Sequence, residues 1–211
     1  MPIRGKILNC LKADYSKIFK SDIILDLVKV LGCGMEIKSK HLKGIEEFNI
    51  DNLRWDKVII CTDADVDGFQ IRTLVLTMIY RLMPTLIEMG KVYIAESPLY
   101  EITIEKTKRK GEKHFAYSDG DKEQILQKLE TEGIERGELD IKRSKGLGEN
   151  QPEMMSLTTM HPATRRLIQV TPENAERTSQ VFDVLLGDNL QERKDHIAKN
   201  GHLYMEMLDI S

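Results

Sequence analysis

The chain reads VIICTDADVDG from Val58 to Gly68, and this stretch decides how the rest of the sequence is interpreted. It begins as a short apolar run, typical of a buried strand, and then carries aspartates at alternate positions, Asp63, Asp65 and Asp67. On an extended chain alternate side chains point the same way, so the sequence predicts that the three carboxylates converge. Two unit charges about 4 Å apart at an effective dielectric of about 20 repel by roughly 4 kcal/mol. A hard divalent cation such as Mg²⁺, which prefers oxygen ligands, would relieve that repulsion.

Two other interpretations compete with a metal site. Asp65 and Asp67 could be turn and helix-cap residues, because Asp67 and Gly68 precede an apolar periodic segment. The spacing also matches the first half of a calcium-binding loop. That loop needs a helix before it and a glutamate at its twelfth position, which here is Leu74, so it is excluded. What remains is a strand that ends in carboxylates and runs into a helix, the usual site geometry of an open α/β sheet.

Length and composition bound the possible classes of protein. The 211 residues suffice for one good core, or for one domain with an appendage. Hydrophobic residues make up 41% and charged residues 31%, and the net charge of −3 predicts that any DNA site is a local basic patch. No apolar run approaches the roughly 20 residues that span a bilayer, and the first residues lack the regions of a signal peptide. Three cysteines without metal-site spacing indicate reduced thiols and a cytosolic protein.

Strands and helices alternate along most of the chain, which predicts an α/β fold with a parallel sheet flanked by helices. The expected strands cover residues 57–61, 91–95, 99–105, 113–117 and 167–170. The expected helices cover residues 21–31, 69–89, 121–129, 172–186 and 190–199, with a further short helix opened by Pro152. Pro84 is expected to kink or restart the helix in which it lies. The predicted domains are an α/β domain at 1–133 and a mainly helical tail region at 134–211.

Basic residues offer further candidate contacts with an anionic ligand. The segment KRSKGLGE, residues 142–149, joins Lys145 and two other cations to two glycines, which let backbone approach a ligand closely. Arg4 and Lys6 could touch a phosphate backbone, and Arg72 could reach a phosphate bound near the carboxylates or pair with them. For Arg4, Lys6 and the segment 142–149, solvated surface charge is the competing explanation. No Ser/His/Asp arrangement is evident, so the chain is expected to supply a metal rather than a nucleophile.

Four stretches in a fixed order carry a family resemblance, and together they cover nearly the whole chain. They are PIRGKILN at 2–9, TDADVDG followed by IRTL within 62–74, VYIA and PLY within 92–100, and KGLGE followed by TTM within 145–160. In order and spacing they resemble the TOPRIM and C-terminal tail region of the B subunits of bacterial type IIA topoisomerases, either DNA gyrase or topoisomerase IV. The resemblance implies a Rossmann-like TOPRIM fold followed by a mainly helical tail.

The resemblance also implies a function, the passage of one DNA duplex through a break in another by an ATP-dependent type II DNA topoisomerase. An A-type breakage-reunion subunit would supply the tyrosine that attacks the DNA phosphate, and the TOPRIM region would hold Mg²⁺ beside it. By position in the family motif, Asp63, Asp65 and Asp67 are the expected metal ligands. The residues carried over as DNA contacts are Arg4, Lys6, Asn9 and Lys145. Expected partners are double-stranded DNA, the A-type subunit and the ATPase region that belongs to the same B-type polypeptide, in the cytoplasm at the nucleoid and not at a membrane.

Two departures from the family pattern qualify these expectations. The family's EGDSAGG motif, whose glutamate is a metal ligand and acid–base residue, lies upstream of the PIRGK stretch, so the chain is expected to begin after it and after the region that binds ATP. The chain would then be a fragment with an incomplete metal site, no assigned catalytic residue and no activity alone. The family often has Ser-His or Ala-His where this chain has Phe69-Gln70, so the role of that histidine is not carried over.

Two other functions stay open at this point. Another TOPRIM enzyme, such as a primase-like polymerase or a nuclease, would share the acidic stretch but not the segment 145–149 or the helical tail. A non-enzymatic module could instead dock a partner through Val181, Val184 and Leu185 of the tail, although an internal core explains these residues equally well. The sequence does not separate gyrase from topoisomerase IV, and it does not fix the number of metal ions bound.

Overall fold

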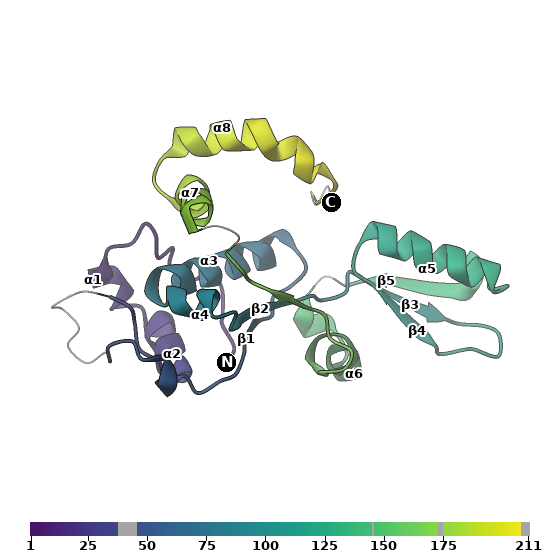
Figure 1. The fold of residues 1–211 in the computed structure, drawn as a ribbon. Coiled ribbons are helices and arrows are strands. Elements are labelled where there is room, and N and C mark those ends of the chain that lie inside the picture. The colour runs from purple at the N-terminus through teal and green to yellow at the C-terminus, as the bar shows by residue number, and fades with distance from the viewer. Residues whose placement is uncertain (38–45, 145, 173–174, 208–211) are drawn as a thin grey trace. The chain divides into compact units, whose positions relative to one another are not determined.

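The structure is a computed structural model, and it describes residues 1–37, 46–144, 146–172 and 175–207 (Figure 1). The chain divides into two compact units. Unit 1 comprises Met1–Ile60, Gln70–Tyr93 and Gln169–Ser211, and unit 2 comprises Cys61–Phe69 and Ile94–Ile168. These units do not test the predicted domain boundary after residue 133, which stays a prediction.

Unit 1 is built mainly from helices. These are α1 (Tyr15–Ile18), α2 (Asp22–Leu31), most of α3 (Val66–Leu82), α4 (Pro84–Glu88), α7 (Ala175–Leu186) and α8 (Leu190–Asn200), with 3₁₀ turns at Ile50–Asn52 and Gly201–Met207. α2 ends at Gly32, whose φ of +83° is the left-handed conformation that glycine adopts at low cost. Pro84 opens α4 directly after α3 ends, because a proline without an N–H donor is tolerated in the first turn of a helix. The predicted restart at Pro84 is confirmed.

The core of unit 1 forms where the apolar faces of α2 and α3 meet the N-terminal segment. Its most deeply buried members include Ile18, Ile24, Met35, Met78, Ile79, Leu82, Met83 and Leu86. Burying one side chain of this size contributes roughly 1.5–3 kcal/mol. This cluster gives α3 a fixed position within unit 1, and α3 is the helix that begins in the acidic stretch.

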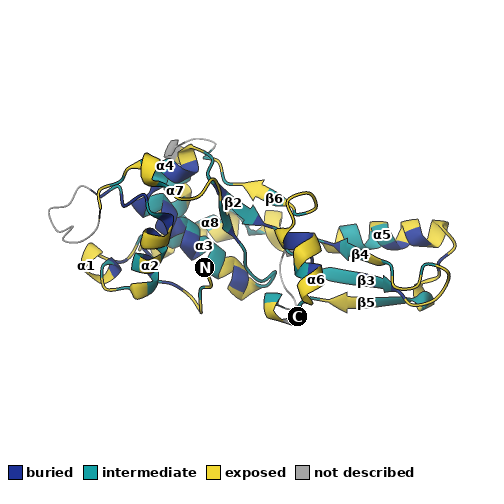
Figure 2. Ribbon diagram, turned by 90° about the horizontal axis from the view of Figure 1, so that it is seen from below, coloured by how far each residue is buried: buried dark blue, intermediate teal, exposed yellow. Residues whose placement is uncertain are grey.

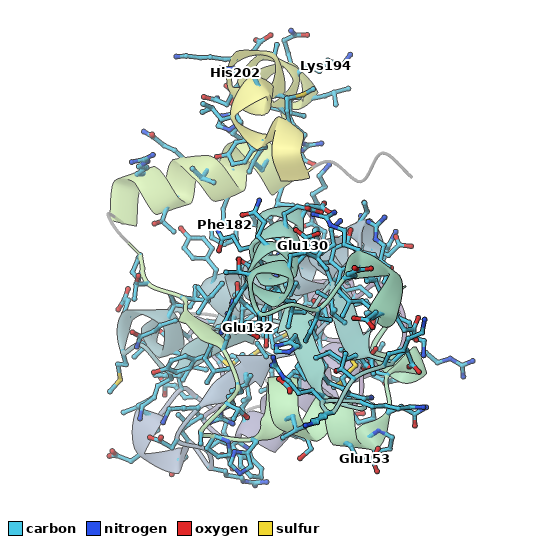
Figure 3. All side chains as sticks on the ribbon, turned by 90° about the vertical axis from the view of Figure 1, so that its right-hand side faces the viewer. Glu130, Glu132, Glu153, Phe182, Lys194 and His202 are labelled. Carbon is cyan, nitrogen blue, oxygen red and sulfur yellow. The ribbon has the colours of Figure 1, made fainter. Side chains whose placement is uncertain are left out.

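The contacts that join the C-terminal helices to the rest of unit 1 include an aromatic pair and two polar contacts. Phe182 projects from the underside of α7 (Figure 3), and its ring stacks on that of Tyr80 in α3 with centroids 4.4 Å apart and planes 4° from parallel. Such a pair contributes about 0.5–1.5 kcal/mol beyond its buried area. Asn9 donates from Nδ2 to the carbonyl oxygen of Leu186 at 3.0 Å, and Lys12 Nζ lies 3.7 Å from Asp188 Oδ1. The predicted helical tail is therefore packed against its own unit.

The first sheet contains the strands β1 (Val58–Ile60), β2 (Val92–Ala95) and β6 (Leu167–Gln169), in the order β1–β2–β6. α3 and α4 connect β1 to β2, which is the strand–helix–strand pattern predicted from the sequence. β6 runs opposite to β2, because the amide of Val170 donates to Val92 while the amide of Glu96 donates to Arg166. The prediction of a purely parallel sheet is therefore wrong. The third strand, β6, comes from a distant part of the chain and pairs antiparallel with β2.

Unit 2 carries an antiparallel sheet covered by one helix. Its strands are β3 (Tyr100–Ile104), β4 (Lys113–Ala116) and β5 (Leu139–Arg143), in the order β4–β3–β5. Figure 1 shows α5 (Asp119–Thr131) along one face, where Ile102 and Ile104 of β3 pack against Leu126 and Leu129. Edge strand β5 is largely exposed, as its colour in Figure 2 shows. The sequence did not predict this strand, because three of its five residues are charged.

The predicted α/β fold class is confirmed. Unit 2 also contains a series of short helical turns after β5. A 3₁₀ turn at Leu147–Glu149 leads to α6 (Pro152–Met155), which begins at the predicted proline and continues as a π-helical turn at Ser156–Met160. Thr158 and Thr159 are buried there and bond to each other through their hydroxyls at 3.2 Å. Among the helices that the structure describes, none is long and apolar enough to cross a bilayer.

Candidate metal and DNA site

The acidic stretch leads into α3, and its middle aspartate caps that helix. Asp65 directly precedes α3, and its Oδ1 accepts a hydrogen bond of 2.7 Å from the backbone N–H of Gly68. This is the bond that an N-cap residue makes with the third residue of its helix. The competing interpretation named Asp65 and Asp67 as turn and cap residues, and because α3 begins at Val66 the cap is Asp65 and not Asp67. Asp67 instead lies exposed in the first helical turn, where a negative charge is favourable.

Asp63 is held by a loop that lies far from it in the sequence. Its Oδ1 accepts a hydrogen bond of 2.6 Å from the backbone N–H of Leu147, 84 positions away. Hydrogen bonds from N–H groups to an ionised carboxylate are shorter and about twice as strong as neutral ones. Gly146 lies alongside, and a Cβ added there would be 3.7 Å from the carboxylate atoms of Asp63. Gly146 and Leu147 of the KGLGE motif therefore lie against the first aspartate of the acidic stretch.

The main chain of Asp63 is fixed from its other side by Gly68. A Cβ added to Gly68 would lie 2.1 Å from the carbonyl oxygen of Asp63, closer than any real Cβ contact. Gly68 is buried, so nothing larger than hydrogen fits between the first turn of α3 and this carbonyl group. Glycine is required here by close backbone approach and not by an unusual torsion angle.

The predicted convergence of the three carboxylates is not observed. In the ranges that the structure describes, no three His, Cys, Asp or Glu side chains gather closely enough to hold a metal ion. The prediction assumed an extended chain through Asp67, but helical geometry begins at Val66, so the alternation of side chains stops after Asp65. The assignment of these aspartates as metal ligands stays a prediction.

The donor set nevertheless suits Mg²⁺ in kind. Carboxylate oxygens are hard ligands, and Mg²⁺ usually binds proteins through only one or two carboxylates together with water and substrate phosphate. Asp63 and Asp65 each use Oδ1 for a backbone N–H, and over the described residues neither aspartate has an ion-pair partner. Both are half-buried rather than hidden. A site built on Asp63, Asp65 and Asp67 would therefore be open, with room for ligands from elsewhere.

Arg4, Lys6 and Arg72, which the sequence predicted to contact DNA, belong to unit 1, whereas the three aspartates belong to unit 2. Arg4 and Lys6 are exposed on the N-terminal segment of unit 1, and Arg72 is half-buried on the part of α3 that belongs to unit 1. Lys145 lies outside the described residues. Within the described residues of unit 2, the loop that follows Lys145 contacts the acidic stretch through the hydrogen bond from the Leu147 amide to Asp63.

Asn9 has a structural use that the sequence did not suggest. Its Oδ1 accepts from the backbone N–H of Leu11 at 3.0 Å, closing a local turn, and its Nδ2 donates to the carbonyl oxygen of Leu186 at 3.0 Å. Both polar ends of the side chain are thus engaged within unit 1. Its predicted contact with DNA is untested, and a role in attaching α7 stands beside it.

One functional candidate escaped sequence analysis altogether, the backbone amide of Leu147. A leucine side chain carries no polar group, so nothing in the residue type indicates a hydrogen-bond donor at position 147. The available signal was the pair of glycines on either side of Leu147, which indicates a backbone that approaches another group closely.

Comparisons with known proteins show which families the chain resembles. Residues 1–97 match the family model described as the Toprim domain, and residues 136–198 match the one described as the carboxyl terminus of the DNA gyrase B subunit. The DNA gyrase B subunits of Halalkalibacterium halodurans and Thermotoga maritima are each 40% identical to this chain over 210 residues, which is 100% of this chain and 30% of theirs. The one from Archaeoglobus fulgidus is 40% identical over 198 residues, 93% of this chain and 28% of that protein.

The chain therefore spans about 30% of the length of the curated relatives that it matches. The two family models lie in the order and near the positions that the four sequence motifs indicated. This chain belongs to the family of DNA gyrase B subunits, with a Toprim domain followed by the gyrase B carboxyl-terminal region.

Proposed function

We propose that this chain is the part of a type IIA topoisomerase B subunit that holds Mg²⁺ beside the DNA phosphate being broken and rejoined. The observation that carries the proposal is the half-buried Asp63 carboxylate, held by the KGLGE loop in a chain of the gyrase B family. The working assembly would also contain double-stranded DNA, an A-type subunit that supplies the attacking tyrosine, and an ATPase region. Its place would be the cytoplasm.

Each residue of the site has a task that follows from its position. Asp63, Asp65 and Asp67 would hold the ion, which when bound supplies positive charge next to the phosphate and the leaving oxygen. Asp65 keeps its carboxylate at the start of α3 because the Gly68 amide holds it there. The exposed Arg4 and Lys6 would contact phosphates along the duplex, which positions DNA without reading its sequence.

We expect the proposed site to work only together with other molecules. Mg²⁺ usually binds through one or two carboxylates, so in this proposal the ion would be shared with the DNA phosphate, water and ligands from outside. The EGDSAGG motif that carries the family's acid–base glutamate does not occur in the 211 residues. We therefore expect no cleavage by this chain alone, and cleavage only in an assembly that includes that motif and the A-type subunit.

The test is Asp63→Ala in a full-length B-type polypeptide assembled with the A-type subunit and DNA. We expect Mg²⁺-dependent cleavage to fall on the order of 100-fold or more, the usual cost of removing one group that stabilises developing charge. Asp140→Ala is the matched control, because this unit 2 carboxylate lies on β5 and pairs with Lys142 at 2.9 Å. Cleavage by Asp63→Ala at the control rate would contradict the proposal. Primer synthesis, or cleavage without the tyrosine of the A-type subunit, would favour another Toprim enzyme.

A role of the tail in docking a partner is supported by one further observation. Val181 and Leu185 on α7 are 39% and 36% exposed, while Val184 is half-buried. Phe182 of the same helix is already used internally, in its stack on Tyr80. The outer apolar residues of α7 are thus available to another protein without disturbing its attachment to α3. Val181→Glu with Leu185→Glu should weaken assembly with the A-type subunit and leave the fold of unit 1 intact.

A further inference from the structure

The loop at residues 146–149 holds Asp63 with a backbone group and not a side chain. Side-chain partners of a carboxylate are visible in a sequence, whereas a backbone donor is visible only in the fold. We propose that the backbone N–H of Leu147 positions the Asp63 carboxylate for Mg²⁺, an inference that rests on the proposed function. Leu147 is a positioning residue in this proposal, since it acts through Asp63 and touches neither DNA nor metal.

The hydrogen bond leaves Asp63 able to bind an ion. The Leu147 amide takes Oδ1 at 2.6 Å, and no residue in the described ranges donates to Oδ2. An amide carries no net charge, so it orients the carboxylate without neutralising it. A lysine or arginine in the same place would compete with the cation for the same oxygens. A group that does not touch the metal but hydrogen-bonds to one of its ligands typically contributes 10- to 100-fold in metal affinity.

Asp63 is constrained at two independent points. Its carbonyl group lies against the first turn of α3, where only glycine fits at position 68. Its carboxylate is held by the amide of Leu147, from a loop in a different part of unit 2. With the main chain fixed by one contact and the side chain by the other, the carboxylate loses little further freedom when it binds a cation. Sites supported in this way bind more tightly than sites whose ligands must be ordered first.

Proline at position 147 removes the donor with little other change. Gly146 has φ −160° and ψ 154°, the extended conformation that a residue before proline adopts. Leu147 is the first residue of a 3₁₀ turn, and proline is accommodated at the start of helical turns. Leu147→Pro therefore deletes the N–H in a backbone that already suits proline. Leu147→Ala is the matched control, because it removes the same side chain and keeps the N–H.

The first measurement tests the bond without any metal. Amide hydrogen exchange is followed by NMR for the wild-type chain, Leu147→Ala and Asp63→Ala. We expect the amide at position 147 to be protected in the first two proteins and to lose at least tenfold of that protection in Asp63→Ala. Equal exchange at this amide in all three proteins would show that the bond is not formed in solution, and the proposal would be overturned.

The second measurement is the Mg²⁺ concentration that gives half-maximal DNA cleavage in the assembly with the A-type subunit. We expect Leu147→Pro to need 10- to 100-fold more Mg²⁺ than Leu147→Ala and to recover the control rate at saturating Mg²⁺. The same requirement in both variants, or a cleavage rate in Leu147→Pro that stays low at every concentration, overturns the positioning role. If Asp63→Ala itself cleaves like wild type, it is the proposed function that fails, which separates the two failures.

Discussion

Unit 2 contains two acidic regions that satisfy their carboxylates in opposite ways. In the acidic stretch, Asp63 and Asp65 accept from backbone N–H groups at 2.6 and 2.7 Å. In the second region, the arginine cluster, acidic side chains accept from guanidinium groups. Its contacts are those of Arg109 with Glu112 and Glu132 and of Arg136 with Glu130, each at 2.6 Å, and Figure 3 labels Glu130 and Glu132 on and just after α5.

The kind of hydrogen-bond partner decides which carboxylates remain available to a cation. A guanidinium group neutralises its partner and uses both oxygens, as Arg109 does with Oε1 and Oε2 of Glu112. It also lowers the pKa of Glu112 and of Glu132, so both stay ionised and paired. A backbone amide holds one oxygen, adds no net charge and cannot swing away without moving the loop. Acidic content alone therefore does not mark a metal site.

The largest expected effect comes from the glycine behind the acidic stretch. Gly68→Ala should destabilise the protein by about 3 kcal/mol, the upper part of the usual range for overpacking, because its Cβ would meet the carbonyl oxygen of Asp63 at 2.1 Å. Urea unfolding measures this change. Gly148→Ala is the matched control, since a Cβ there meets nothing within 4 Å. Equal stability of the two variants would show that Asp63 is not fixed by α3, which removes one of the two constraints on it.

Much of the fold was predictable from residues whose effect is local. Pro84, Gly32 and Pro152 each act through their own backbone, and each lies where the structure starts or ends a helix. The apolar strands β1 and β2 were predictable because buried strands read as short apolar runs. Strand β5 was missed because its partner β3 lies more than thirty residues earlier, and an exposed edge strand needs no apolar pattern.

The members of the candidate site could be proposed from the sequence, but the geometry of the site could not. The motif identified Asp63, Asp65 and Asp67, but the choice between an extended chain and a helix at residue 66 depends on how α3 packs. The contact of Asp63 with Leu147 was out of reach, since it joins residues 84 positions apart through a backbone group that every sequence contains. A long-range contact made by a backbone group does not depend on residue type, so it cannot be read from the sequence. In this case the two glycines beside Leu147 were the one indication in the sequence that the backbone approaches another group.

A smaller effect separates the two roles of Asp65. Asp65→Ala removes the cap of α3 and should lower the free energy of unfolding by about 1 kcal/mol. Asp65→Asn keeps a side-chain oxygen for the Gly68 amide, so its stability should stay within a few tenths of a kcal/mol of the wild type. Both variants lose the charge, and both should therefore weaken Mg²⁺-dependent cleavage in the assembly. Full cleavage by Asp65→Asn would assign Asp65 to the cap alone and leave Asp63 and Asp67 as ligands.

The smallest effect is expected in the arginine cluster, where pairs are exposed to solvent. Arg109→Met should lower the melting temperature slightly at pH 7, because Glu112 and Glu132 lose a partner that the folded state provides. The pKa of each glutamate is lowered by Arg109 in the folded protein, so the stabilisation is fully present above the ordinary value of 4.5. It is lost as the pH falls through the lowered folded values, where both glutamates take up protons.

The difference in melting temperature between wild type and Arg109→Met should therefore shrink as the pH is lowered below 4.5, and also in concentrated salt, which screens exposed pairs. Mg²⁺ at millimolar concentration should leave this difference unchanged, because the glutamates are already paired with cations of the chain. A difference that persists below the lowered pKa values would mean that Arg109 acts through packing of its stem on the hairpin. Specific protection of Arg109→Met by Mg²⁺ would show that freed glutamates can bind a cation, and that the paired arginine is what keeps this second acidic region from doing so.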